Sequence, residues 1–295
     1  MATNQDISAA FPFESKYVEV HGSKMHYIDE GTGDPILFLH GQPTSSYLWR
    51  NIVPHLTSLG RCIAPDLIGF GKSDKPDIEY RFLDHVKYVE GFIEKMDLKN
   101  ITLVIHDWGS GLGFHYAMRH EDNVKGIAFM EAILMSIPSW DAFPADFVEV
   151  FKAFRTPDVG WDMIVNQNMF VEQILPGAMV RKMTEEEMNT YREPFRDPAA
   201  RKPVWRWPNE LPIGGEPADV NDAVNAYNQK LQQSALPKLL FHATPGALIT
   251  PEAVEWCRQN LKSLDTVDIG QGLHFLQEDN PHLIGSELAS WYRRL

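Results

Sequence analysis

The sequence predicts an α/β protein with a mostly parallel sheet, helices on both faces and an inserted helical cap. Three observations lead to this class. Short apolar runs alternate with helical patterns over 1–131, as expected for strands buried on both faces. Helical patterns without any such run fill 132–236. The alternation returns over 237–295, so we expect a core in two parts with the cap between them.

The composition is that of an ordinary globular protein, with 295 residues, 44% hydrophobic and 23% charged. Acidic residues outnumber basic ones by 40 to 27, a net charge of −13. Such a surface repels phosphate groups, so nucleic acid and anionic membranes are unsuitable partners. Met1–Glu14 shows no leader pattern, and no apolar run approaches the roughly 18 residues of a membrane span. We therefore expect a cytoplasmic protein.

The two cysteines, Cys62 and Cys257, are far apart and form no CxxC pair. This spacing argues against a zinc site and against a disulfide scaffold. We expect two reduced, buried thiols.

The first part of the chain begins with a hairpin, in which 16–21 and 25–30 alternate around Gly22. Continuous apolar runs then predict buried strands, and amphipathic patterns predict helices between them. The strands are expected at 35–40, 61–66, 101–106 and 124–130, and the helices at 47–56, 82–96 and 109–119.

The stretch over 132–236 is rich in Trp, Phe, Met and Pro, and its helical patterns, such as 144–154 and 184–194, are separated by Pro and Gly. We expect it to cover the carboxyl ends of the strands. The core then resumes with strands at 238–243 and 266–269 and helices at 251–260 and 283–295.

Polar side chains follow four of the predicted strands at the point where each strand ends. They lie in His40–Pro43, in His106–Gly111, at Glu131 and in Gly272–Phe275. Ligands of open parallel sheets bind at the carboxyl ends of the strands. We therefore expect these four segments to converge on one site.

Asp107 occupies a strand–turn–helix segment with small residues after it, the layout of a nucleophile elbow. The usual serine is replaced by a carboxylate. A simple helix N-cap is the alternative role for Asp107. A carboxylate is already ionised near neutral pH, so it can attack saturated carbon directly and form an ester.

Cleavage of that ester by water requires a base. Of the histidines after the cap, His274 lies in a glycine-flanked loop after the final strand, whereas His242 lies inside a strand and His282 begins a helix. We expect His274 to be the base. Its carboxylate partner cannot come from 242–250, which contains no acid, so Glu131 is the candidate, and its apolar neighbours predict that it is buried.

Trp108 and Gln42 complete the predicted site. Their backbone N–H groups would form the oxyanion hole for ester hydrolysis. Their side chains add an indole N–H and an amide NH2. Two neutral donors facing an apolar cavity suit a departing halide ion.

Six stretches carry a family resemblance: HGQPTSSYLWR (40–50), PDLIGFGKS (65–73), HDWG (106–109), MEA (130–132), YREPF (191–195) and GLHFLQED (272–279). With these stretches the chain resembles the haloalkane dehalogenases of the α/β-hydrolase superfamily over essentially its whole length. The resemblance implies Asp107 as nucleophile, His274 as base, Glu131 as acid and Trp108 as halide ligand. The place of Glu131 marks the subgroup with its acid after the sixth strand. One departure is Gln42, because that subgroup usually has Asn there.

In similar dehalogenases, eight further positions line the substrate pocket or tunnel: Phe151, Phe154, Phe170, Ile174, Pro208, Ile213, Leu248 and Leu273. An apolar lining favours a small halogenated hydrocarbon. No metal or organic cofactor is implied, water and a halide ion are the other small partners, and the protein is expected to be a monomer or a homodimer.

Four other functions stay open. Coelenterazine luciferases resemble dehalogenases in the elbow, the acid and the histidine. Epoxide hydrolases commonly use two cap tyrosines, and this cap has only Tyr191 and Tyr227. Haloacetate dehalogenases carry Arg where this chain has Trp108. A non-catalytic ligand-binding protein on the same fold is the fourth alternative.

Overall fold

The computed structural model describes residues 7–295. The first six residues, on which part of the expectation about a leader segment falls, lie outside the described residues. Eight strands form one sheet in the order β1-β2-β4-β3-β5-β6-β7-β8. The strands β1 and β2 form the expected antiparallel hairpin, β2 is antiparallel to β4, and all other neighbours are parallel. The strands are β1 (Lys16–Val20), β2 (Ser23–Glu30), β3 (Pro35–Leu39), β4 (Arg61–Pro65), β5 (Ile101–Asp107), β6 (Val124–Ala132), β7 (Lys238–Pro245) and β8 (Leu264–Gly272).

The central strands are mostly apolar because both of their faces are covered. In β3, Leu37 and Leu39 belong to the core on one side of the sheet, and Ile36 and Phe38 to the core on the other. This alternation follows from the two-residue period of a strand. It confirms the prediction of a doubly covered, mostly parallel sheet.

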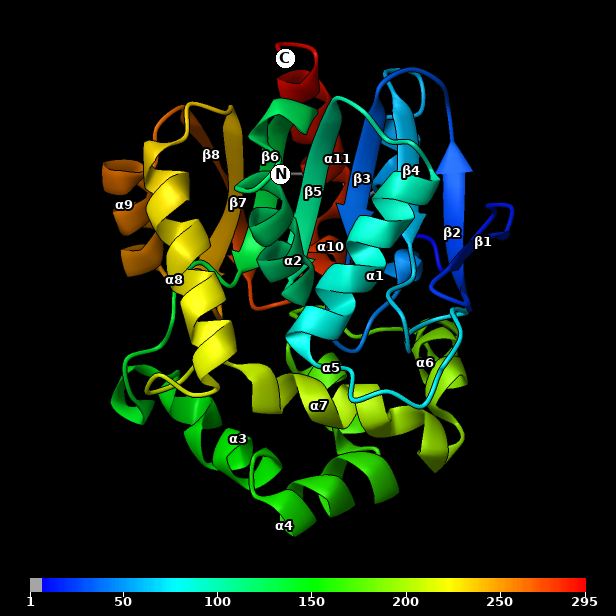
Figure 1. Ribbon diagram of the computed structural model, residues 1–295, viewed down its shortest axis with the longest axis vertical. Coiled ribbons are helices and arrows are strands. Elements are labelled where there is room, and N and C mark those ends of the chain that lie inside the picture. The colour runs from blue at the N-terminus through cyan, green and yellow to red at the C-terminus, as the bar shows by residue number, and fades with distance from the viewer. Residues whose placement is uncertain (1–6) are drawn as a thin grey trace.

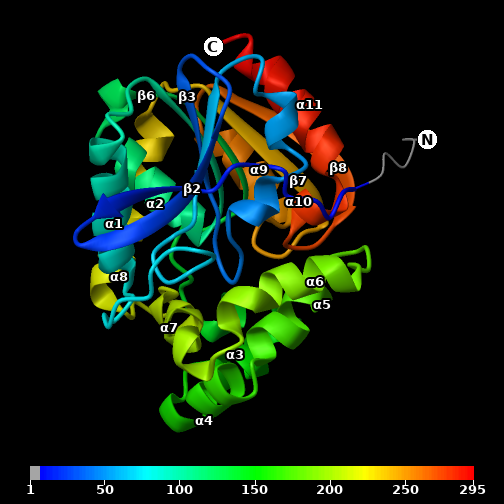
Figure 2. The same cartoon turned by 90° about the vertical axis from the view of Figure 1, so that its right-hand side faces the viewer.

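Helices cover both faces of the sheet, with α1, α2 and α8 on one side and α11 on the other (Figure 2).

The prediction of one helix over 47–56 is wrong. Two short 3-10 helices, η1 (Ser46–Trp49) and η2 (Val53–His55), stand there, because Pro54 cannot donate an N–H to a continuous helix. The core helices are α1 (Phe82–Lys95), α2 (Trp108–Ala117), α8 (Ala218–Gln233), α9 (Pro251–Asn260), α10 (Leu276–Asp279) and α11 (Pro281–Tyr292), with the 3-10 helix η3 (Glu121–Asn123).

The cap lies across the carboxyl ends of the strands, at the bottom of Figure 1. Helix α8 falls within the range 132–236 expected for the cap, yet it packs along α2 of the core. The limits of the cap stay a prediction. Its helices are α3 (Val148–Phe154), α4 (Pro157–Trp161), α5 (Leu175–Gly177), α6 (Glu185–Arg192) and α7 (Lys202–Glu210), with the π-helical turns η6 (Asp162–Asn166) and η7 (Phe170–Ile174) and the 3-10 helices η4 (Trp140–Ala142), η5 (Ala145–Phe147), η8 (Glu193–Phe195) and η9 (Pro198–Arg201).

Cys62 and Cys257 are free and buried, as expected. Burial raises the pKa of both thiols to about 12. Within residues 7–295, no helix combines the length and the apolar character needed to cross a membrane.

Candidate active site

The polar segments that follow the strands meet at the edge of the sheet that faces the cap. Asp107 ends β5 and Glu131 lies near the end of β6. Gln42 follows β3, and His274 follows β8. Parallel strands bring these ends together although the residues are far apart in the chain.

Asp107 has a backbone conformation that L-residues rarely adopt, with φ 49° and ψ −129°. This turn exposes the carboxylate between the strand and α2, as in a nucleophile elbow. Two glycines leave the space that this turn needs. A Cβ at Gly41 would overlap the carboxylate of Asp107, and a Cβ at Gly109 would overlap the carbonyl oxygen of Leu39.

His274 lies between the two carboxylates of the site. Its Nε2 is 3.5 Å from Oδ1 of Asp107, and its Nδ1 is 3.2 Å from Oε2 of Glu131. Its backbone is also held, because its N–H donates to the carbonyl of Ala178 and its carbonyl accepts from Nε2 of His106 at 2.9 Å. The imidazole is therefore oriented as in a catalytic triad.

Glu131 is fully buried and does not point to solvent. Its carboxylate accepts N–H groups from Ala247 (3.1 Å), Leu248 (2.7 Å) and Ile249 (3.3 Å). These residues belong to the loop after β7, the loop that contains no acid. That loop therefore supplies hydrogen-bond donors to a carboxylate from the neighbouring strand, which offsets the cost of burying the charge.

The charges of the site act on one another. Burial by itself lowers the pKa of His274, but hydrogen bonds and ion pairs with Asp107 and Glu131 outweigh it and raise the pKa to about 9. Burial by itself raises the pKa of Asp107, but His274 and the N–H of Gln42 outweigh it and hold that pKa below its usual value. The two acidic neighbours therefore favour the protonated form of His274.

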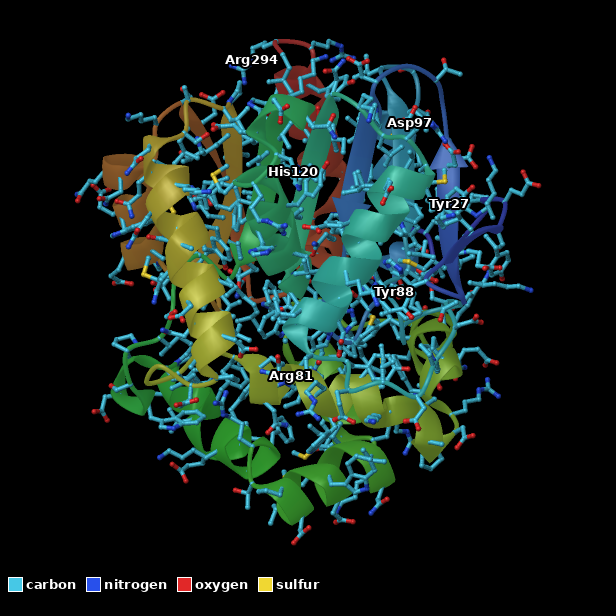
Figure 3. The ribbon with its side chains drawn as sticks, in the orientation of Figure 1. Tyr27, Arg81, Tyr88, Asp97, His120 and Arg294 are labelled. Atoms are coloured by element: carbon cyan, nitrogen blue, oxygen red, sulfur yellow. The ribbon has the colours of Figure 1, made fainter. Side chains whose placement is uncertain are left out.

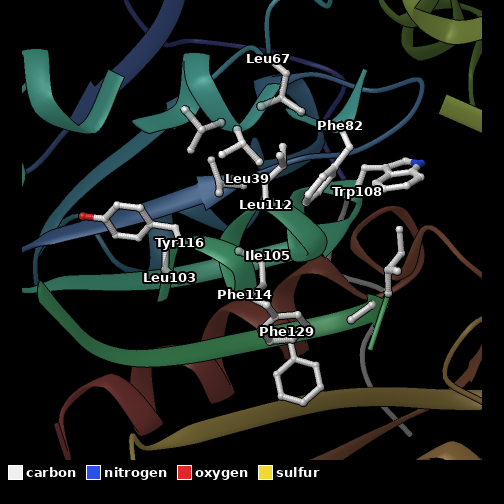
Figure 4. Packing of buried hydrophobic residues seen from close by; sticks show 14 of the residues in the cluster. Leu39, Leu67, Phe82, Leu103, Ile105, Trp108, Leu112, Phe114, Tyr116 and Phe129 are labelled. Atoms are coloured by element: carbon white, nitrogen blue, oxygen red, sulfur yellow. The ribbon is translucent and has the colours of Figure 1, made fainter. Parts of the chain in front are cut away.

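Gln42 contributes to the site through its backbone and its side chain. Its backbone N–H donates to Oδ2 of Asp107 at 2.8 Å. In its side chain the Oε1 atom is buried without a partner among the described residues, and the residue lines the cavity. Trp108 lines the same cavity, and the ring of Phe82 lies beside its indole (Figure 4).

The cavity at Asp107 is enclosed mainly by the cap and is almost entirely apolar. Of the eight pocket positions expected from the sequence, Phe151, Phe170, Ile174, Pro208 and Leu248 line it. The other three positions do not line it. Phe154 is fully buried and packs against Phe151 and Phe170, and Ile213 is held in short bridges to Ile137 and Glu216. Leu273 is not among the residues around the cavity, although its neighbour His274 is.

Sequence reasoning missed other residues of the cavity wall: Phe143, Pro144, Phe147, Ala178, Leu211, Ala247 and Phe275. A signal for two of them was present, since Phe143 and Phe147 precede Phe151 at intervals of four residues. For Ala178 and Leu211 no local pattern distinguishes a wall position from cap core.

The comparisons with known proteins agree with this geometry. A family model described as alpha/beta hydrolase fold matches residues 34–281. A haloalkane dehalogenase of Mesorhizobium japonicum is 48% identical, over 93% of this chain and 89% of the relative. Another, of Sphingobium indicum, is 48% identical over 97% of this chain and 98% of the relative. The chain belongs to the haloalkane dehalogenase family.

The fold of this haloalkane dehalogenase is also shared with solved members of the family. The structure of haloalkane dehalogenase DbeA from Bradyrhizobium elkani superimposes with a TM-score of 0.94 at 44% identity, covering 96% of this chain and 98% of the other. The assignment to the α/β-hydrolase fold is thereby confirmed.

Two further features separate this dehalogenase from the enzymes that share its elbow. The hydroxyl of Tyr191 donates to Glu278, and that of Tyr227 donates to the carbonyl of Ile133, so neither tyrosine faces the cavity. An epoxide hydrolase would need such acids there. Among the residues around the cavity there is also no Arg or Lys to hold the carboxylate of a haloacetate.

Proposed function

We propose that this haloalkane dehalogenase hydrolyses carbon–halogen bonds of small halogenated hydrocarbons through a covalent ester on Asp107. The observation that carries the proposal is the chain Asp107–His274–Glu131 at the wall of an apolar cavity whose other polar groups are the neutral donors of Trp108 and Gln42. The apolar wall offers nothing to bind a charged substrate and limits solvation of the nucleophile.

In the first step a carboxylate oxygen of Asp107 attacks the carbon that bears the halogen. The new C–O bond forms as the C–X bond breaks, and the bonding electron pair leaves with the halide ion. The indole N–H of Trp108 and the NH2 of Gln42 would stabilise this ion by hydrogen bonds. Halide is a weak base, so no acid has to protonate it.

Ester formation also changes His274. The imidazole loses its negatively charged neighbour Asp107, so its pKa falls and it can release its proton. The neutral imidazole then takes a proton from water while the oxygen of that water attacks the ester carbonyl. The N–H of Gln42, together with that of Trp108, would hold the developing oxyanion, and Glu131 stabilises the imidazolium. The bond between the carboxyl carbon and the alkyl oxygen then breaks, and the departing oxygen takes the remaining proton of the added water, so the alcohol leaves and Asp107 is again a carboxylate. The proton that His274 released after ester formation is the one proton of the net reaction.

The test is halide release from 1-bromoalkanes, combined with intact-protein mass spectrometry. The Asp107→Ala variant is expected to lose activity by at least about 10^4-fold because the nucleophile is gone. The His274→Phe variant is expected to form the ester and not hydrolyse it, so its mass increases by that of the alkyl group. His242→Phe serves as a matched control, since His242 lies in β7 and does not line the cavity. Turnover that survives in Asp107→Ala would refute the proposal.

The cytoplasmic location and the state as monomer or homodimer stay predictions. Cell fractionation and the molar mass from light scattering would test them.

A further inference from the structure

We propose that Trp207, on cap helix α7, is a positioning residue that holds the indole of Trp108 in the orientation needed to bind halide. The halide role of Trp108 belongs to the proposed function, and the present inference rests on it. Trp207 itself does not line the cavity.

The structural basis is a column of three stacked rings, Trp108–Trp207–His85. The ring centroids of Trp108 and Trp207 are 4.4 Å apart with an interplanar angle of 17°. Those of Trp207 and His85 are 4.2 Å apart with an angle of 23°. Trp207 and His85 are fully buried, and Trp108 is only 3% exposed. Near-parallel rings at this separation are in favourable contact.

The three rings come from different elements, so the column joins the cap to the core. Trp108 is the first residue of α2, and His85 lies in the first half of α1. Trp207 belongs to α7 of the cap and is inserted between these two core rings. The position of the cap helix therefore determines the plane in which the indole of Trp108 lies.

A second contact fixes α7 against the same part of the core. The carboxylate of Glu210, three residues after Trp207 and 1% exposed, accepts the N–H of Phe82 at 2.9 Å and Nε of Arg81 at 3.1 Å. Phe82 begins α1, so Glu210 also satisfies a free N–H at the start of that helix. Arg81 lies where α1 meets the cap (Figure 3). Residues three apart share a helix face, so Glu210 and Trp207 dock together.

The column restricts rotation of the Trp108 ring, and halide binding depends on that rotation. The N–H of an indole lies in the ring plane, so a rotation of the ring moves the donor away from the halide. Trp207 covers one face of the Trp108 indole. The ring centroid of Phe82 lies 5.9 Å from that of Trp108, with an interplanar angle of 46°. Pro208, the next residue after Trp207, lines the cavity. One short segment of α7 therefore forms part of the wall and holds the halide donor.

His85 completes the column as a flat neutral ring. Both of its ring nitrogens are buried without a partner in the part of the chain that the structure describes. Burial, with a smaller contribution from His40, lowers the pKa of His85 to about 3. The ring is uncharged at neutral pH, so its contribution is contact with Trp207.

The experiment compares Trp207→Leu with Trp207→Phe, which keeps a ring. Three quantities are measured. The first is the inhibition constant of bromide, obtained by following turnover through the released proton. The other two are the single-turnover rate of ester formation and the rate of ester hydrolysis. For Trp207→Leu we expect bromide binding and ester formation to weaken by about tenfold, since an aromatic pair contributes about that factor. Ester hydrolysis should change less than about twofold, and Trp207→Phe should recover most of the loss.

The matched control is Trp49→Leu. Like Trp207, Trp49 is fully buried, and its indole N–H has no partner among residues 7–295, but it lies in η1 on the other face of the sheet. The Trp49→Leu variant shows how the loss of any buried indole affects the protein, and it should leave the inhibition constant of bromide unchanged. Equal slowing of both half-reactions in Trp207→Leu, or an unchanged bromide constant, would overturn the proposal.

Two further outcomes are distinguishable. If Trp207→Leu does not fold, His85→Ala, which uncovers the outer face of Trp207, should weaken bromide binding by about threefold, and no change there would overturn the proposal. If the unmodified protein forms no ester, the proposed function fails, while bromide affinity measured by calorimetry still tests the column.

Discussion

Two regions of this protein contain buried carboxylates close to one another, and in only one of these regions is a carboxylate placed to act as a nucleophile. The first is the triad of Asp107, His274 and Glu131. The second is a charge cluster of Arg50, Arg181, Glu187, Glu278 and Tyr191, where the cap meets the core. In the charge cluster Arg50 bonds to Glu278 at 2.6 and 2.8 Å and to Glu187 at 2.8 Å. Arg181 bonds to both glutamates as well.

The two regions differ in how completely their carboxylates are paired. Two guanidinium groups face two carboxylates in the charge cluster, and the hydroxyl of Tyr191 adds a further donor to Glu278. The triad has two carboxylates and one imidazole, and Asp107 opens onto an apolar cavity. In a fully paired buried carboxylate the charge is compensated and the oxygens are occupied, whereas a carboxylate with a free side toward an apolar cavity keeps an electron pair available for attack.

The two regions are also physically linked. Glu278 lies in α10, four residues after His274. The carbonyl of Ala178 in the cap accepts the N–H of His274, and Asp279 accepts the N–H groups of Val180 and Arg181. The charge cluster therefore fastens the cap to the segment that carries the base.

Of the effects that test this comparison, the largest is expected when the same change is made in both regions. Glu131→Gln should lower turnover by about 10^3- to 10^4-fold, because the neutral amide no longer stabilises the imidazolium. The ester on Asp107 should accumulate and be visible by intact mass. Glu278→Gln is the matched variant and should not trap the ester. Similar ester accumulation in both variants would remove the distinction between the regions.

The next effect is on stability. Arg50→Met leaves Glu187 and Glu278 buried with one guanidinium fewer, so the free energy of unfolding should fall by about 3–5 kcal/mol in urea titrations. Adding Glu278→Met should cost less than the sum of the two single changes, since the second change removes an unpaired charge. Strictly additive losses would show that the pairing in the charge cluster contributes little.

A third prediction concerns pH. In the free enzyme Asp107 and Glu131 together raise the pKa of His274 to about 9, against the effect of burial. The ester no longer carries the charge of Asp107, so the pKa of His274 falls and its neutral form prevails at lower pH. The rate of ester hydrolysis should therefore rise with pH and level off at an apparent pKa below 9. Single-turnover measurements on preformed ester would show this, and levelling off at 9 or above would contradict it.

The smallest effect is expected at Gln42, where a neutral amide serves the site. Gln42→Asn keeps the NH2 but shortens its reach by one methylene, so the bromide inhibition constant should change by less than about fivefold. Gln42→Leu removes the donor and should weaken bromide binding by about tenfold or more. A loss in Gln42→Asn as large as that in Gln42→Leu would mean that the donor position depends on the full length of the glutamine side chain.

The sheet could be predicted from the sequence because each buried strand is a short apolar run, and such a run can be recognised without knowing the fold. Prediction from the sequence failed at 47–56, where Pro54 divides the segment into two short helices. The site residues Asp107, Glu131 and His274 could be proposed because each lies at or near the end of a strand, and the ends of parallel strands converge.

The cavity wall and the aromatic column could not be predicted in this way. Phe151 and Phe154 are alike in sequence, yet only Phe151 faces the cavity, because the choice depends on how the cap helices pack. Nothing local connects Trp207 with Trp108 and His85.

By itself the sequence determined the strands, the order of the elements and the chemical groups at the strand ends, because these depend on neighbouring residues and on the short period of a strand. Only the tertiary structure decided which carboxylates are fully paired, which side chains border the cavity and how the cap holds Trp108. Those properties arise from contacts between segments far apart in the chain, and no local pattern encodes their distances.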